Sequence, residues 1–187
     1  MSGRAYLSAQ SAVRPRLEVR APRLRSTLVR VAATVGCLSV SAAGCSGEVE
    51  VSPTDPSGVA AEQCETLIAD LPGHVAGQEA RLVQPADALA GAWGDPPIVL
   101  RCGAVKPPLL RRDSSCFVVN DVGWFAEEDG RPVTGTESVD GEVVFTTIGR
   151  STYVEVTVPP GYQPPARALV DLADVIAAAT DDVRPCV

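Results

Sequence analysis

The chain has 187 residues, a length that fits one domain with extensions. Residues 1–44 carry a net charge of +6, whereas residues 45–187 carry nine Lys and Arg against 22 Asp and Glu, a net charge of −13. Because nucleic-acid binding depends on clustered Lys and Arg that neutralise phosphates, this acidic body argues against a nucleic acid as partner. Arginine outnumbers lysine fifteen to one, a bias associated with GC-rich bacterial genomes.

The first 44 residues have the pattern of a signal peptide. Seven arginines and one acid precede residues 31–43, which carry no charge. These thirteen residues are too few to span a bilayer, but they match the apolar region of a secretory signal. Small residues, Ala42-Ala43-Gly44, then precede Cys45 as in the bacterial lipobox, although Ala42 stands where leucine is usual. We therefore predict a lipoprotein signal peptide over residues 1–44.

Cys45 is the predicted lipidation site. We expect a diacylglycerol anchor on its sulfur, with palmitate among the acyl chains, and cleavage of the signal peptide just before it. Two alternatives remain open: ordinary cleavage near Ala43 that leaves Cys45 unmodified, and an uncleaved anchor. Residues 45–58 are polar and rich in Pro and Ser, which predicts a flexible tether. Residues 59–187 are predicted to form a single extracytoplasmic domain at the outer face of the plasma membrane.

Four cysteines follow the predicted lipidation site. An even number in an exported domain predicts two disulfides. Of the three pairings we favour Cys64 with Cys102 and Cys116 with Cys186, because Cys64 lies on the apolar face of a predicted helix and should meet an interior strand. Buried free thiols are the alternative. His74 is the sole histidine and no cysteines have the spacing of zinc ligands, so no metal or other cofactor is expected.

Two amphipathic helices are predicted. Apolar residues recur every three or four positions over residues 60–71, where Leu71-Pro72-Gly73 ends the pattern. Residues 165–180 show the same period, with Leu169, Leu172 and Ile176 along one side. A short helix over residues 85–90 is a further option, because proline is favoured in the first turn of a helix.

Residues 93–103 are predicted to form the central strand of the domain. A Gly-Asp-Pro-Pro turn signal comes first, and the consecutive apolar residues Ile98, Val99 and Leu100 follow it. Such an uninterrupted apolar run is typical of a strand that is covered on both faces. Cys102 and Gly103 end the stretch.

Further strands follow this central one. The pair Asp140-Gly141 predicts a two-residue hairpin turn. The last strand alternates, with Val154, Val156 and Val158 predicted to face inward. The predicted strands cover residues 116–119, 142–148 and 152–158. Together these elements predict an α+β fold, with a small antiparallel β-sheet, two amphipathic helices packed on one face, and disulfides that staple the layers.

Several short motifs between residues 60 and 180 carry a family resemblance. They are Cys64 with Leu67 and Leu71-Pro72, Trp93-Gly94-Asp95-Pro96, Arg101-Cys102-Gly103, Val119-Asn120 with Gly123-Trp124, Phe145-Thr146-Thr147, and Tyr153-Val154-Glu155-Val156 with Val158-Pro159. On these residues the chain resembles an actinobacterial family of cell-envelope lipoproteins, domain of unknown function 3515. The resemblance implies export and lipidation, with no known activity, substrate or cofactor. The Cys64–Cys102 pairing suits this pattern, whereas Cys116 and Cys186 are additions to it.

The sequence holds none of the common catalytic motifs. It lacks a Gly-x-Ser-x-Gly elbow, a Ser-x-x-Lys pair, a phosphate-binding glycine loop and a Cys-x-x-Cys motif. The candidate binding surface instead joins aromatic rings to polar side chains, a combination that binds sugars by stacking and hydrogen bonds. Its residues are Trp93, Asp95, Arg101, Asn120, Trp124 and Tyr153. In the alternative interpretation both tryptophans pack at the edge of the core, Asp95 caps a turn, and Arg101 pairs with Asp95 or Glu155.

Two functions are compatible with these observations. The first is a noncatalytic lipoprotein, anchored to the plasma membrane, that binds an envelope protein or a cell-wall component. The second is a cell-wall glycan hydrolase or other carboxylate-dependent enzyme, with Asp95 or Glu155 as the acid or base. A carboxylate of perturbed pKa in a deep cleft beside Trp93 would favour the enzyme, and a flat surface around Trp93 and Trp124 would favour the binding module.

Overall fold

The computed structural model describes residues 47–135 and 138–184, which belong to one compact unit of the chain, Ala43–Val187. The predicted signal peptide, Cys45 and Cys186 lie outside the described residues. Among the described residues, no helix is both long and apolar enough to cross a bilayer.

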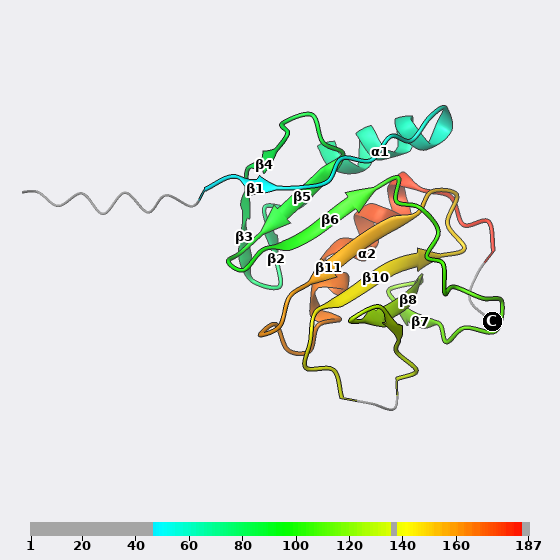
Figure 1. Ribbon diagram of the computed structural model, residues 1–187. Helices are drawn as coiled ribbons and strands as arrows, with labels where there is room; N and C mark the ends of the chain where they lie inside the picture. Colours follow the sequence, from blue (N-terminus) through cyan, green and yellow to red (C-terminus); the bar gives the residue numbers. More distant parts are fainter. Residues whose placement is uncertain (1–46, 136–137, 185–187) are drawn as a thin grey trace, which may run out of the picture. The chain divides into compact units, whose positions relative to one another are not determined.

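The core of the domain is a nine-stranded sheet in which every described pair of neighbours is antiparallel. The strand order is β2-β3-β5-β6-β11-β10-β8-β7 (Figure 1). Strand β9 lies off this path and pairs with β8. The strands are β2 (His74–Val75), β3 (Gln78–Arg81), β5 (Ala90–Trp93), β6 (Ile98–Cys102), β7 (Phe117–Val119), β8 (Val122–Glu128), β9 (Arg131–Pro132), β10 (Val143–Ile148) and β11 (Val154–Val158). The prediction of a small sheet was therefore wrong. The short helix over residues 85–90 is also absent, and β5 begins at the end of that range.

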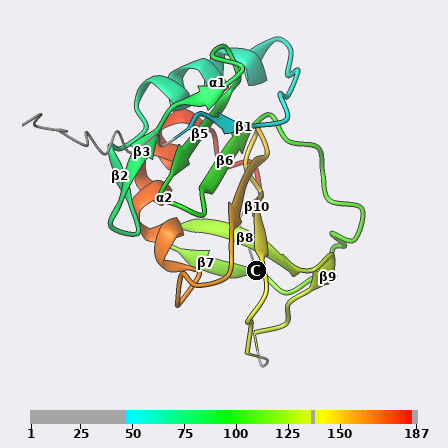
Figure 2. The same ribbon diagram turned by 60° about the vertical axis from the view of Figure 1, so that its left-hand side comes forward.

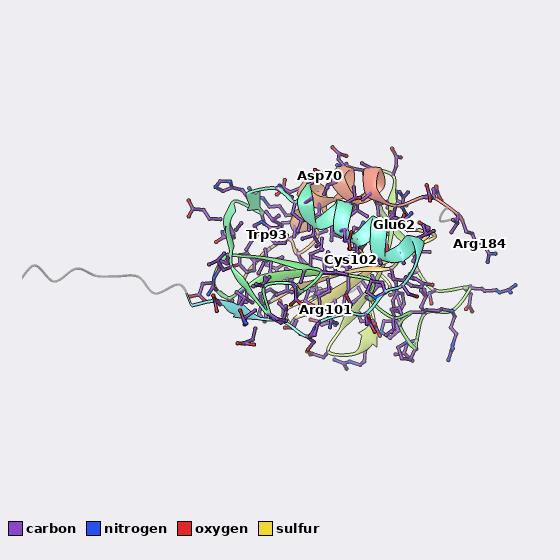
Figure 3. All side chains as sticks on the ribbon, turned by 90° about the horizontal axis from the view of Figure 1, so that it is seen from above. Glu62, Asp70, Trp93, Arg101, Cys102 and Arg184 are labelled. Atoms are coloured by element: carbon purple, nitrogen blue, oxygen red, sulfur yellow. A yellow bond between two sulfur atoms is a disulfide. The ribbon has the colours of Figure 1, made fainter. Side chains whose placement is uncertain are left out.

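Two helices, α1 (Val59–Ala69) and α2 (Arg167–Ala179), lie together on one side of the sheet (Figure 3). Both were predicted, to within two residues at each end. The buried face of α2 carries Ala168, Leu169, Leu172, Ala173 and Ile176. The inward alternation of β11 is confirmed, since Val154, Val156 and Val158 are fully buried. We call the side of the sheet away from the helices its outer face.

Residues 93–103 form the turn and second strand of a hairpin. Trp93 at the end of β5 faces Ile98 at the start of β6. Gly94 in the turn has φ +77°, and a Cβ there would lie 2.6 Å from the Tyr162 hydroxyl, so the turn requires glycine. As predicted, β6 is a central strand, between β5 and β11.

The predicted disulfide between Cys64 and Cys102 is confirmed, and it joins α1 to β6 across fully buried sulfurs. Their Cα atoms are 5.4 Å apart. Cys116 is disulfide-bonded as well, and its predicted partner, Cys186, lies outside the described residues.

The hairpin predicted at Asp140-Gly141 does not form. Both backbone N–H groups donate to the Glu128 carboxylate, at 2.8 and 2.7 Å, and β10 pairs with β8 and β11 instead. A tight hairpin turn occurs at Asn120-Asp121, between β7 and β8, where φ is +44° and +64°. Asn and Asp tolerate these positive values better than most residues, which suits a hairpin turn.

The segment predicted as a flexible tether is attached to the domain from Gly47 onward. Strand β1 (Val49–Glu50) pairs in parallel with β4 (Val83–Gln84). The Thr54 hydroxyl donates to the Cys102 carbonyl, and Pro56 packs against Gly103, where a Cβ would lie 2.6 Å from the proline ring. Local sequence could not reveal this docking, because every partner of the segment lies more than 30 residues away.

Candidate functional site

The two tryptophans of the predicted binding surface are buried in the core. Trp93 is 1% exposed, and its indole N–H donates to the Pro72 carbonyl at 2.8 Å. Trp124 is 0% exposed and meets Phe145 edge to face, with ring centroids 6.5 Å apart. Neither ring is available to stack on a sugar, so the predicted aromatic surface is wrong and the alternative, core packing, is confirmed.

The polar members of that surface are separated from the tryptophans and from one another. Arg101 lies on the outer face, whereas Trp93 lies on the helix side of the sheet (Figure 3). The Arg101 guanidinium forms an ion pair with the Glu155 carboxylate at 2.5 Å. Asp95 is 92% exposed, with an oxygen 4.0 Å from Arg81. Asn120 lies in the β7–β8 turn and is exposed.

Tyr153 differs from the other residues of the predicted surface because it lines a pocket that none of them lines. This pocket has a volume of about 530 Å³ and lies at the end of the sheet where β6 and β10 finish and β11 begins. Its walls come from the loop after β6, the turn from β10 to β11, and residues 183–184. Figure 2 shows that loop, in green, on the outer face of the sheet, away from α2. The pocket therefore combines three segments that are distant in sequence.

The pocket concentrates positive charge on an acidic domain. Five of the nine Lys and Arg in residues 45–187 line it, and no described lining residue is Asp or Glu. We call these five the basic cluster: Lys106, Arg111, Arg112, Arg150 and Arg184. A concave basic site in a body of net charge −13 focuses a local positive potential that attracts anions.

The end of α2 holds one wall of the pocket in place. The Arg150 guanidinium donates to the Thr180 hydroxyl and to the Ala177 carbonyl, both at 2.9 Å, and to the Thr180 carbonyl. A cation at the last carbonyls of a helix satisfies groups that the helix leaves unpaired and interacts favourably with its dipole. The backbone N–H groups of Val183 and Arg184 donate to the Gly149 carbonyl at 2.7 and 3.0 Å, which brings Arg184 to the pocket.

The opposite wall is a turn within the loop after β6. The Arg111 backbone N–H donates a hydrogen bond to the Ser114 hydroxyl at 2.8 Å, and the Ser114 backbone N–H donates one to the Arg111 carbonyl. Cys116, at the end of this loop, is disulfide-bonded. Arg111 and Arg112 are adjacent in the sequence, but their convergence with Arg150 and Arg184 depends on the fold.

The carboxylates proposed for an enzyme do not form a cleft beside Trp93. Asp95 lies at the turn of the β5–β6 hairpin, whereas Glu155 faces Arg101 near the other end of β6. On the outer face, burial and then the negative charge of Glu155 raise the pKa of Glu127 above its usual range. Neither Glu127 nor Glu155 lines the basic pocket as described. No group of three or more His, Cys, Asp and Glu among the described residues could hold a metal ion.

The raised pKa of Glu127 predicts a pH dependence of stability. The folded protein holds this proton to higher pH than the unfolded chain does, so stability falls as pH rises through the window above the ordinary carboxyl pKa. Glu127→Gln replaces the carboxyl group with a neutral amide, so the loss of stability caused by ionisation of Glu127 no longer occurs. The substitution should therefore raise the free energy of unfolding more at about pH 7 than at about pH 4. Urea unfolding at both pH values measures the difference, with Glu142→Gln, at an exposed position, as the control. An equal effect at both pH values would contradict the prediction.

These features define a class: an α+β domain with a disulfide between its layers and a basic pocket at one end of the sheet. The chain belongs to the DUF3515 family, proteins of unknown function, whose family profile matches residues 26–184. No curated protein and no solved structure was found to match this chain.

Proposed function

We propose that the protein is a noncatalytic, membrane-anchored module of the bacterial cell envelope that binds an anionic ligand in its basic pocket. One observation carries the proposal: five cationic side chains surround a cavity of about 530 Å³ on a strongly acidic domain. That volume falls within the range of small-molecule sites, about 300–1,000 Å³.

The side chains around the pocket support binding rather than catalysis. The sole histidine of the chain, His74, lies in β2 and does not line it. Ser114 accepts a hydrogen bond from the Arg111 backbone N–H, no described hydrogen bond joins it to a His, Asp or Glu side chain, and Cys116 is disulfide-bonded. The described lining thus offers positive charge and hydrogen-bond donors but no nucleophile paired with a base.

Anion-dependent stabilisation tests the pocket. Sulfate and citrate, compared with chloride at equal ionic strength, should raise the midpoint of thermal unfolding, because a ligand that binds only the folded state stabilises it. Arg111→Gln with Arg112→Gln should remove most of this rise. Arg131→Gln with Arg167→Gln changes two exposed arginines outside the pocket and should leave it intact. Equal rises in all three proteins would reduce the effect to general salting-out and contradict the proposal.

Cell fractionation tests the anchor. Cys45→Ser removes the sulfur that would carry the lipid, so the protein should move from the membrane fraction to the medium. A single acyl chain gives only marginal membrane binding, whereas a multiply acylated cysteine holds a protein firmly. If Cys45→Ser stays in the membrane fraction, the lipoprotein assignment is wrong.

A further inference from the structure

We propose that the ligand of the basic pocket is an organic phosphate with two or more negative charges, taken from the side of the domain that faces away from the membrane. This inference rests on the anion-binding function proposed above and adds the chemical class of the ligand and its direction of approach.

The charges of the basic cluster are largely uncompensated. The described salt bridges of the domain involve Arg81 and Arg101, and neither lines the pocket. Lys106, Arg111, Arg112 and Arg184 are exposed and form no ion pair with a described carboxylate. Four cations that have no described carboxylate partner surround one cavity and repel one another, so a bound anion lowers the free energy of the folded protein.

The nearest carboxylates in the sequence do not line the cavity. Asp113 lies between Arg112 and Ser114, and Asp181 and Asp182 precede Val183, yet none of the three is among the described lining residues. The Asp181 carboxylate accepts a bond from the Gln63 amide of α1 at 3.1 Å. Because the cations outnumber the acids at the cavity, a singly charged carboxylate would leave most of the positive charge unmatched.

The arginine-rich composition of the cluster favours phosphate. Its five members comprise one lysine and four arginines, of which Arg150 is already bonded to the end of α2. A guanidinium presents donors in a planar fork that matches the oxygens of a phosphate, and the resulting charge-assisted pairs are stronger than neutral ones. A doubly charged phosphate can engage two such forks at once.

An apolar wall completes the cavity. Leu110 is 7% exposed, and Ile148 and Tyr153 are partly buried, so the lining offers aliphatic and aromatic surface beside the charges. A cavity of about 530 Å³ has room for a group beyond the phosphate itself. The lining therefore suits a phosphate ester with an uncharged, partly apolar portion better than bare inorganic phosphate.

The docked N-terminal segment sets the direction of approach. The Arg81 guanidinium donates to the carbonyls of Gly47 and Gly94, which places the start of the described chain beside the β5–β6 turn. The pocket lies at the other end of β6. Figure 3 shows Arg184 at the end of the domain opposite the first described residues, in cyan.

An anchor at Cys45 would hold the turn end of the domain close to the bilayer. Only four residue steps separate Cys45 from Val49, a reach of at most about 14 Å. The pocket then lies at the end of the domain that is farther from the membrane, out of reach of the headgroups of the anchoring bilayer. The phosphate source is a soluble or wall-attached molecule.

A matched pair of aromatic dianions tests the ligand class. Phenyl phosphate and phthalate carry similar charge on the same ring, one as phosphate and the other as two carboxylates. We expect calorimetric titration of the full-length protein to give about tenfold tighter binding of phenyl phosphate. Arg111→Gln with Arg112→Gln should weaken that binding by about tenfold or more, whereas Arg131→Gln with Arg167→Gln should not.

The outcomes separate the two proposals. If phthalate binds as tightly as phenyl phosphate, the phosphate class is overturned while the anion-binding function stands. If neither dianion binds, both proposals fail. If inorganic phosphate binds as tightly as phenyl phosphate, the proposal that the ligand has an organic portion is overturned.

A vesicle experiment tests the direction of approach. The lipidated protein is inserted into phosphatidylcholine vesicles with and without phosphatidylglycerol, and phenyl phosphate is titrated into both. The dissociation constant should be the same, because the pocket lies at the end of the domain opposite the anchor. A loss of phenyl phosphate binding on the phosphatidylglycerol vesicles alone would show that lipid headgroups occupy the pocket and would overturn the proposed source.

Discussion

Replacing both Cys64 and Cys102 with alanine is expected to lower the free energy of unfolding by about 4 kcal/mol. The disulfide closes a loop with a sequence separation of 38, and that loop contains β2 to β5 and most of β6. Without the covalent link, the unfolded chain gains conformational freedom that it must lose again on folding. Urea denaturation of the full-length protein measures the change.

The reduced protein provides the control for this prediction. A reducing agent should destabilise the wild type more than the double alanine variant, because only the wild type has the Cys64–Cys102 bond to lose. A variant that loses less than about 1 kcal/mol would show that the packing of α1 on the sheet, and not the covalent link, holds the two layers together.

Trp124→Ala is expected to destabilise the domain by about 3–5 kcal/mol, the range for large aromatic residues removed from a core. Its ring is fully buried on the helix side of β8 and packs against Phe145, so its removal leaves a cavity that the surrounding sheet can close only in part. Thermal or urea unfolding measures the loss. This result would also separate the core role from the surface role that the sequence suggested.

Two variants serve as controls for Trp124→Ala. Trp124→Phe keeps most of the ring and removes an indole N–H that has no hydrogen-bond partner among the described residues, so its cost should be clearly smaller. Val118→Ala, at a position that is 60% exposed, should change stability by no more than about 0.5 kcal/mol. If Trp124→Ala were as mild as Val118→Ala, the burial of the indole ring would be contradicted.

The basic pocket changes how the acidic charge of this protein is understood. A net charge of −13 over residues 45–187 was the basis for the prediction that nucleic acid is not a partner. This net charge does not reveal that the pocket is locally positive, because five of the nine Lys and Arg in residues 45–187 line one cavity. Net charge describes the average field of a domain, whereas ligand binding responds to the local field.

The amino-acid sequence by itself determined the elements whose signals are local. Helices α1 and α2 follow from apolar residues spaced every three or four positions, and β11 follows from the alternation of Val154, Val156 and Val158. The Cys64–Cys102 disulfide was only the favoured one of three pairings, chosen because Cys64 lies on an apolar helix face, and the structure confirmed it. The helix and strand signals require only neighbouring residues, because backbone periodicity decides which side chains share a face.

Only the tertiary structure decided what those elements meet. Trp93 and Trp124 could have faced solvent or core, and the helices on one side of the sheet determine that both are buried. Residues 47–56 were predicted to belong to a flexible tether, because their partners, β4 and the end of β6, lie far away in the chain. The pocket joins Lys106 to Arg184 for the same physical reason: long-range backbone pairing, which no local pattern encodes, brings distant cations together.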